Sequence, residues 1–443
     1  MFIYQRDQLL NLADEVLRLA RRGGASAAEA DVYESLGQGV SVRLHETEHI
    51  EYQQDTALEV TVYVGHKKGS ASTADFSAKS IAQTVQAALD IARYTAEDDC
   101  AGLADKALMA KNIGDLDLYH EWDLSTQAAQ DLALRCEEAA LSHDKRVDNS
   151  EGASVHSGHS HGVYANTHGF AAYDRATRHS MSCTAVARDA RGMQRDYWFD
   201  AARSAADLAQ PEEIGRIAAQ RTLARLGAGS LNTGTYPVVF DRTVAGSLIG
   251  HLIGALSGGS LYRRSSFLCD SLGKKILADK VQLREEPHLP RTFAAAYYDD
   301  EGVATQPRTV VRNGVIEGYF LSSYSARKLG MKTTANAGGI HNLMMQPTVA
   351  RQEDLLRHMG TGLLVTELMG QGVNVLTGDY SRGASGFWVE NGVIVRPVDE
   401  ITIASTLPQM FAAIVDIADD ALRRSTHKIG SILIEEMTVA ASG

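Results

Sequence analysis

Two Asn-Gly pairs constrain the fold of this 443-residue chain more than any other feature of its sequence. Asn313-Gly314 lies between the apolar runs TVVR and VIEGYF, and Asn391-Gly392 lies between GFWVE and VIVRP. Because Asn-Gly tolerates the positive φ angles of a two-residue turn, each pair predicts a β-hairpin. The second half of the chain is therefore expected to be rich in antiparallel strand.

Helix and strand patterns alternate irregularly over the rest of the chain. Apolar residues alternate with polar ones near 40–44 and 58–64, which predicts strands, and the segments 150–200 and 432–440 are also typical of strands. Helices are predicted over residues 7–22, 77–94, 125–142, 211–226, 242–256, 322–329 and 408–422. This order favours an α+β fold with mostly antiparallel sheet over alternating βα units.

The polar run GAGSLNTG, residues 227–234, marks a change in the organisation of the chain. A helix that begins at Pro211 and ends at Gly227 precedes it, with proline and glycine at their expected ends. A chain of this length is expected to hold two or three domains. We predict an N-terminal mixed α/β domain over 1–228 and a C-terminal domain dominated by antiparallel sheet over 229–443.

Charge and cysteine usage narrow the class of protein and its location. A net charge of −12 argues against a surface that binds nucleic acid directly. The four cysteines share no CxxC spacing and are expected to be reduced thiols. The start of the chain lacks the apolar core of a secretory signal, and no run reaches the roughly 20 apolar residues of a membrane helix. We therefore predict a cytoplasmic protein without a membrane segment.

Residues His45 to His49, HETEH, match the HExxH pattern of zinc peptidases. That site requires a helix, where residues four apart lie about 6 Å from each other on one face. The flanking segments VSVRL and IEYQQ alternate like strands, in which four residues span roughly 13 Å. We expect a polar turn between edge strands here.

Residues 158–162, GHSHG, match the GxSxG pattern of a nucleophile elbow. An elbow requires a strand that turns into a helix, whereas the following VYANTHGFAAY predicts strand, turn and strand. His156, His159 and His161, with His168 nearby, could chelate a metal adventitiously. No acidic or cysteine ligand lies among them, so we expect a solvated, histidine-rich strand end.

Several longer stretches resemble the TldD/PmbA family. They are EGASVHSGHSHGVYANTHGF, GSLIGHLIGALSGGSLYRRSSFLCDSLGKKI, TTANAGGIHNLMMQP (333–347) and GDYSRGASGFWVENGVIVRPVDEITIAST (378–406). With the N-terminal helix and meander they cover most of residues 10–440. Within the family, GDYSRGASGF (378–387) is similar to the PmbA (TldE) branch rather than the TldD branch.

The TldD branch of this family holds zinc with an HExxxH helix and a cysteine near the C-terminus. Aligned on the shared Ser265-Ser266, that helix falls on residues 249–254. Ile249, Gly250 and Gly254 then occupy the positions of the first His, the Glu and the second His. The resemblance thus implies that this chain lacks the zinc ligands.

A second register, beginning at His251, places Leu252 at the Glu and Leu256 at the second His, and no cysteine follows Cys269. Two His ligands, a base and a thiolate are what such a site requires. We expect His251 to be a helix residue near the edge of a core. We expect close packing or a loop at the neighbouring glycines, Gly250, Gly254, Gly258 and Gly259.

The resemblance implies a non-catalytic, metal-free subunit that pairs with a TldD-type subunit, which would carry the zinc. This chain is expected to hold no cofactor, and peptidase activity is expected only with that partner. Such pairs degrade peptides, including microcin precursors, and were first described as modulators of DNA gyrase. The chain alone could also form a homodimer. The alternatives are a peptidase in its own right, with metal at HETEH or the histidine cluster, and a module that binds a peptide or gyrase without proteolysis.

Two polar, glycine-rich segments, 333–347 and 378–387, provide candidate site residues. An extended peptide needs main-chain partners and polar side chains along a groove. The candidates for lining a peptide groove or the subunit interface are Asn336, His341, Asn342, Asp379 and Arg382. The alternative is that an Asp–Arg pair and asparagine side chains only fix loops.

Overall fold

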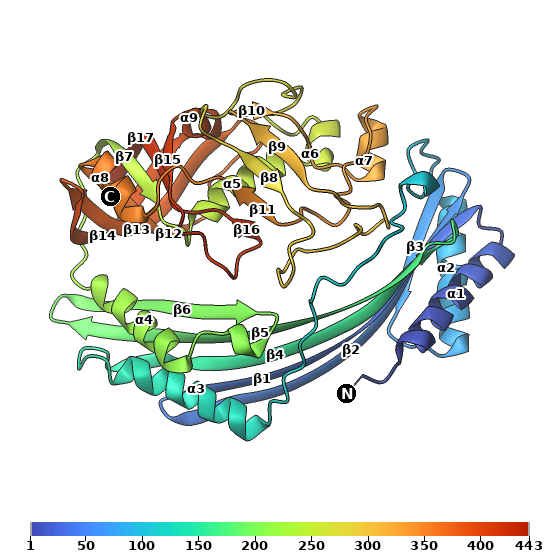
Figure 1. The fold of residues 1–443 in the computed structure, drawn as a ribbon, viewed down its shortest axis with the longest axis horizontal. Coiled ribbons are helices and arrows are strands. Elements are labelled where there is room, and N and C mark those ends of the chain that lie inside the picture. Colours follow the sequence, from blue (N-terminus) through green and yellow to red (C-terminus); the bar gives the residue numbers. More distant parts are fainter. Residues whose placement is uncertain (1, 442–443) are drawn as a thin grey trace.

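The computed structural model describes residues 2–441, and its N-terminal half is built on one long antiparallel sheet. The strand order is β3-β2-β1-β4-β5-β6, and the strands curve beneath the C-terminal half (Figure 1). They are β1 (Ala27–Arg43), β2 (Glu46–Val64), β3 (Lys67–Thr73), β4 (Asn149–Asn166), β5 (Ala171–Asp189) and β6 (Gly192–Ala202). Because β1 pairs with β4, segments more than 100 residues apart in the chain form the centre of this sheet.

Helices cover the two ends of this sheet and leave its middle to other segments. α1 (Arg6–Arg22) and α2 (Ala78–Tyr94) bury an apolar cluster at one end, and α3 (Thr126–Leu141) and α4 (Pro211–Ala224) bury a second cluster at the other. Each helix buries one stripe, as the 3.6-residue periodicity predicts. Two short 3-10 helices, η1 (Lys106–Leu108) and η2 (Ala205–Asp207), lie in the connections.

A second six-stranded sheet forms the core of the C-terminal half. Its order is β14-β13-β12-β7-β17-β15, and β14 also pairs with β17. The strands are β7 (Gly234–Phe240), β12 (Gly362–Met369), β13 (Asp379–Glu390), β14 (Val393–Thr406), β15 (Ile414–Ile417) and β17 (Ile432–Ala441). α5 (Ala245–Ala255) packs on one face of this sheet and α8 (Gln352–Met359) on the other.

A smaller sheet of five strands packs beside them in the order β10-β9-β8-β11-β16. Its strands are β8 (Leu283–Glu285), β9 (Arg308–Arg312), β10 (Val315–Ile316), β11 (Leu343–Met345) and β16 (His427–Lys428). The remaining helices are α6 (Gly258–Tyr262), α7 (Ser323–Lys328) and α9 (Leu407–Ala412). The predicted α+β class is confirmed, as are both hairpins: Asn313, Gly314, Asn391 and Gly392 all have positive φ.

The prediction of a helix over 408–422 is wrong. α9 ends at Ala412, and Ile414–Ile417 is the strand β15, which pairs with β17. The β-branched residues Ile414, Val415 and Ile417 favour the extended backbone once a partner strand is present. No helix in the described part of the chain is both long and apolar enough to cross a membrane.

Candidate functional site: a cavity between the two halves

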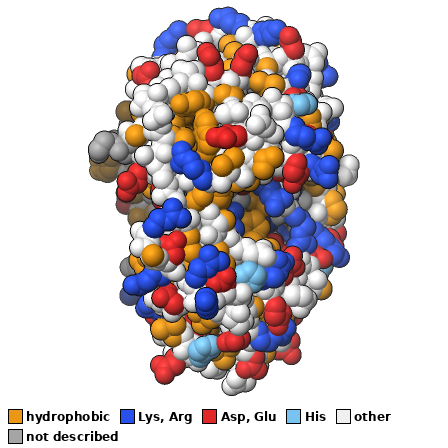
Figure 2. Space-filling view, turned by 90° about the vertical axis from the view of Figure 1, so that its left-hand side faces the viewer, with side chains coloured by type: hydrophobic (Ala, Val, Ile, Leu, Met, Phe, Trp, Pro, Cys, Tyr) orange, Lys and Arg blue, Asp and Glu red, His pale blue; other side chains and the backbone are white. Residues whose placement is uncertain are grey.

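A cavity of about 600 Å³ lies between the N-terminal sheet and the C-terminal half. β6 contributes Trp198 and Phe199, and the first turn of α5 contributes Gly246 and Ser247. Arg382 of β13 and the segment 422–429 complete the wall. Figure 2 shows the hollow between the two halves, with Lys and Arg side chains gathered at its border.

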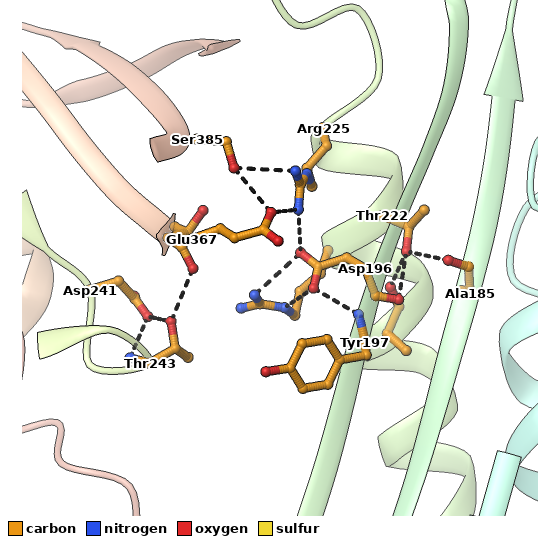
Figure 3. Close-up of polar contacts among 12 residues, drawn as sticks. Ala185, Asp196, Tyr197, Thr222, Arg225, Asp241, Thr243, Glu367 and Ser385 are labelled. Atoms are coloured by element: carbon orange, nitrogen blue, oxygen red, sulfur yellow. Dashed lines mark hydrogen bonds and ion pairs between the residues drawn. The ribbon is translucent and has the colours of Figure 1, made fainter. Parts of the chain in front are cut away.

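An ion-pair network holds the two halves together beside this cavity (Figure 3). Arg225, at the end of α4, pairs with Glu367 of β12 and donates a hydrogen bond of 3.2 Å to Ser385 Oγ of β13. Asp196 of β6 lies 3.7 Å from the same guanidinium and 3.2 Å from that of Arg221. These contacts link α4 and β6 to the C-terminal sheet and so fix one wall of the cavity.

One face of helix α5, beside the cavity, is formed by glycines and carries no side chains. Its apolar stripe, which includes Leu248 and Leu252, is buried in the core. Gly246, Gly250 and Gly254 recur every four residues on another face, and a Cβ added at any of them would meet no atom within 4 Å. The expectation of close packing is therefore wrong for Gly250 and Gly254, which border open space.

At the other two glycines the surroundings are tighter. A Cβ at Gly258 would lie 2.2 Å from Ser325 Oγ, so close packing explains this glycine. At Gly259 the nearest atom is 3.2 Å away, on the flexible Arg263 side chain.

Three buried polar atoms without hydrogen-bond partners lie where α5 meets β13. They are His251 Nε2, Tyr380 Oη and Arg382 Nε. The ring centroids of His251 and Tyr380 are 6.0 Å apart. Burial, with the charge of Arg382, lowers the pKa of His251, so this imidazole is neutral at pH 7. Burial raises the pKa of Tyr380 to about 12, against the opposing charge of Arg382.

The donors at this position do not fit a catalytic zinc ion. Ile249 is buried in the core, and Gly250 and Gly254 carry no donor, which leaves His251 as a single ligand. Across residues 2–441, no group of three or more His, Cys, Asp or Glu side chains is arranged to hold a metal ion.

The HETEH segment lies in the turn between β1 and β2 and at the beginning of β2, so the predicted turn is confirmed. The prediction of edge strands is wrong for β1, because β4 pairs with its other side. Leu44 and His45 form the turn with φ of 50° and 67°, and β2 begins at Glu46. His45 and His49 are both exposed and lie near different carboxylates, Glu138 and Glu51. The two imidazoles therefore have separate surroundings.

The GHSHG motif lies inside the strand β4, so Ser160 is not at a strand-to-helix elbow. The expectation of a solvated, histidine-rich strand end is wrong for His161. This imidazole is 3% exposed, lies 3.2 Å from Glu34 and stacks on Phe2. Its position near the middle of the sheet, packed against the N-terminal segment, accounts for its burial.

Three candidates, Asn336, His341 and Asn342, are buried beside β8. Asn336 Nδ2 and the backbone N–H of His341 both donate to Glu285 Oε1, at 2.8 Å and 2.7 Å. Asn342 Nδ2 donates to the carbonyl of Glu286 at 3.1 Å. Glu285 is 1% exposed and also pairs with Arg308 at 2.7 Å. These contacts fix the 333–347 segment to the small sheet.

Asp379 and Arg382 do not pair with each other. Their odd spacing in β13 places them on opposite faces of the strand. Asp379 is exposed and accepts a hydrogen bond from Thr377, whereas Arg382 turns toward the cavity. Of the five candidates, Arg382 is the one that lines the cavity.

Other cavity residues were absent from the sequence prediction. Trp198 and Phe199 lie in the run DYWFDAA, whose aromatic residues were a usable signal. Arg424 lies in the run RRSTHK, which follows a polar stretch and gave none. Tyr380 was part of the quoted segment 378–387, and only the packing of α5 on β13 shows that it faces His251.

Family models match three segments of the chain, described as PmbA/TldA metallopeptidase domain 1 at 28–92, central domain at 119–226 and C-terminal domain at 233–441. The chain belongs to the PmbA/TldD metallopeptidase family. The resemblance inferred from the motifs is thereby confirmed. The first two of these family domains supply the strands of the long sheet. The cavity lies between the central and C-terminal family domains.

Proteins similar to this chain carry protease and gyrase-modulator descriptions. Metalloprotease PmbA of Escherichia coli O157:H7 is 48% identical over 98% of this chain and 97% of its own length. A solved structure from Bacteroides thetaiotaomicron, described as a modulator of DNA gyrase, is 28% identical with a TM-score of 0.93 over 99% of both chains. TldE from Thermococcus kodakarensis shares the fold, with a TM-score of 0.84 at 20% identity over 97% of this chain and all of that one.

Proposed function

We propose that this chain is the metal-free subunit of a heteromeric metalloprotease, in which a TldD-type subunit supplies the zinc and the catalytic groups. One observation carries the proposal: the face of α5 at the position of the family's zinc helix presents Gly250 and Gly254 to open space. The two glycines leave this space open and supply no metal donor. A role through shape and contact fits such a surface better than a role in bond cleavage.

The cavity is suited to hold part of a peptide. Its volume of about 600 Å³ lies within the roughly 300–1,000 Å³ of ligand pockets, enough for a few side chains. Aromatic side chains and guanidinium groups line it together, so it offers both apolar area and hydrogen-bond donors. We further propose peptides, including microcin precursors, as substrates of the assembled enzyme, and the cytoplasm as its location.

The relatives of this chain support a partner of the TldD type. A chain described as a Metalloprotease TldD homolog, from Buchnera aphidicola, is 22% identical over 83% of this chain. Two related chains can meet through equivalent surfaces in a pseudo-symmetric dimer. In this proposal the C-terminal half, residues 230–443, forms most of the interface, and Arg382 lines the groove.

Co-purification with a TldD-type chain, followed by zinc analysis and a peptide-cleavage assay, tests the proposal. We expect a stable complex, zinc in the partner, and cleavage by the mixture that neither chain matches alone. One tightly held zinc per copy of this chain alone would favour a peptidase in its own right. A TldD-type chain that cleaves as fast alone as in the mixture would contradict the proposal.

A further inference from the structure

The cavity between the two halves is basic, although the chain carries a net charge of −12. Five arginines line it, against the two carboxylates of Asp196 and Glu367. Both carboxylates already have arginine partners: Asp196 pairs with Arg221 and Arg225, and Glu367 pairs with Arg225. The remaining guanidinium groups of the wall therefore have positive charge that these two carboxylates do not neutralise.

Four of the lining arginines form no ion pair within residues 2–441; they are Arg178, Arg242, Arg382 and Arg424. The Nε atoms of Arg382 and Arg424 are buried and have no hydrogen-bond partner. A buried donor of a charged group that stays unpaired destabilises the fold. Such donors in the wall of a cavity are consistent with a ligand that accepts hydrogen bonds.

Aromatic side chains hold two of these four guanidinium groups in place. Arg424 lies over the rings of Phe199 and Trp198, at 4.0 Å and 4.3 Å from their centroids. Arg178 lies over Phe293 at 4.7 Å. Stacking on a ring uses the face of a guanidinium and leaves its N–H edge free for a bidentate acceptor.

The start of α5 adds to the positive potential of the cavity. Val244, the N-cap residue, provides no side-chain cap, and the first turn contains no acidic residue. Val244, Gly246 and Ser247 all line the cavity. The backbone N–H groups of Ala245 and Ser247 donate to the carbonyls of Asp241 and Val244, and the dipole of this 11-residue helix places partial positive charge at this end.

We propose that the cavity is a carboxylate-binding subsite for a peptide, in which Arg382 and Arg424 grip the carboxylate of an acidic side chain or of the peptide C-terminus. The substrate role rests on the proposed function, whereas the binding is a property of this chain alone. A pocket of this size fits a few peptide residues, and its apolar lining, such as Leu368 and Ile429, suits a peptide better than a nucleic acid backbone.

Fluorescence titration of the full-length chain tests the subsite, because Trp198 is part of its wall. The probes are acetyl-pentaglutamate amide, acetyl-pentaglutamine with a free C-terminal carboxylate, and the neutral acetyl-pentaglutamine amide. We expect at least one carboxylate probe to bind about tenfold or more tightly than the neutral one, and the stronger of the two identifies the source of the carboxylate. Equal binding of all three probes, or tighter binding of a five-residue oligothymidylate, would overturn the proposal.

Matched variants assign the binding to the cavity. Arg382→Gln and Arg424→Gln should each weaken the carboxylate probe about tenfold or more, because each removes a charged donor at similar size. Arg312→Gln is the control: this exposed arginine of β9 pairs with Glu317 and does not line the cavity. Arg178→Gln, at the exposed rim, replaces either variant that fails to fold. Equal losses in the control and the cavity variants would overturn the assignment.

The two proposals fail separately. An assembled enzyme that cleaves peptides, combined with a cavity that shows no carboxylate preference, contradicts only the subsite. Carboxylate binding by this chain, without a complex or any gain in cleavage, contradicts only the subunit role.

Discussion

Gly250 illustrates how a single residue shapes the surface of α5. It lies in the interior of an 11-residue helix, where glycine costs about 1 kcal/mol relative to alanine. A Cβ at this position would not clash with any neighbouring atom, because the space beside Gly250 is open. The glycine is therefore explained by the space that it leaves rather than by packing.

Replacement of Gly250 by alanine should stabilise the protein. We expect Gly250→Ala to raise the free energy of unfolding by about 0.5–1 kcal/mol, because the helix gains propensity without a clash. Gly215→Ala is the matched control within a helix, since its Cβ would lie 1.9 Å from the Cys136 carbonyl oxygen. That variant should lose about 1–3 kcal/mol. Urea unfolding measures both; equal destabilisation would contradict the open face of α5.

Asp299 should make stability depend on pH. Burial, with the nearby charge of Glu301, raises its pKa to about 7, although three backbone N–H groups, those of Ala337, Val303 and Glu301, oppose the shift. The carboxyl of the unfolded chain releases its proton near pH 4, so the stability that Asp299 contributes is present below that pH and is lost as the pH rises to about 7.

The Asp299→Asn variant tests this pH dependence. Between pH 5 and pH 8 we expect the wild-type chain to lose about 2 kcal/mol of unfolding free energy through this group. The variant should lack that part of the loss, whereas the exposed Asp123→Asn should retain it. The measurement is urea unfolding at both pH values, and identical pH dependence in wild type and Asp299→Asn would refute the role of Asp299.

The sequence identified one of the residues that meet at the cavity. Arg382 was a candidate because its segment is polar and glycine-rich. Trp198 and Arg424 belong to segments far apart in the chain, and only the packing of β6 against the C-terminal half joins them. Contacts of this kind leave no local pattern, which is why sequence reasoning did not find them.

At the scale of elements, the hairpin between β1 and β2 shows why a motif match can mislead. The backbone N–H groups of Leu44 and His45 donate to the buried Glu137 carboxylate at 2.8 Å and 2.9 Å. The turn is therefore fixed through its backbone and not through the imidazoles. Matching residue types at HETEH say nothing about the distance between the side chains unless the backbone is helical.

Loss of either imidazole should leave the protein nearly unchanged. We expect His45→Ala and His49→Ala to alter the free energy of unfolding by about 0.5 kcal/mol or less and to preserve peptide cleavage by the assembled complex. Glu137→Ala should destabilise by about 1–3 kcal/mol, since two backbone donors lose their acceptor. Chemical denaturation and the cleavage assay check these outcomes. A folded His45 or His49 variant without activity would make HETEH the leading site.

The elements differ in how well the sequence predicted them. The four long helices of the N-terminal half lie within a few residues of their predicted bounds, because each has a regular apolar stripe. β2 is much longer than predicted, since its residues 46–55 are exposed and give no alternation. The helix prediction over 408–422 was wrong because a short apolar run does not distinguish a helix from a strand.

At the scale of the whole molecule, exposed apolar side chains are our candidates for an assembly surface. The apolar segments 408–422 and 432–440 contribute mainly to the internal core. By contrast, Val393, Ile394 and Val395 are 63%, 45% and 54% exposed where β14 begins. A durable interface buries at least about 1,200 Å² with an apolar centre, and this hairpin is our choice for part of it.

Substitution at this hairpin should affect association and leave the fold intact. We expect the free chain to form a homodimer at micromolar concentration and a TldD-type chain to displace one copy, because related surfaces compete. Ile394→Lys should weaken both associations about tenfold or more without lowering the unfolding midpoint. Analytical ultracentrifugation of the chains alone and mixed gives the result; association that is unaffected by the substitution would exclude this surface.

The long N-terminal sheet has a consequence for synthesis on the ribosome. β1 provides Val32 to one apolar cluster and Val40 to the other, and β4 does the same with Val163 and Val155. The pairing of β1 with β4 extends from Glu29↔Asn166 to Val42↔Ala153. The first strand must therefore wait, unpaired on one edge, until the ribosome has released more than 100 further residues. Neither of the first two family domains can therefore complete its folding alone on the ribosome, because the hydrogen bonds between β1 and β4 join one domain to the other.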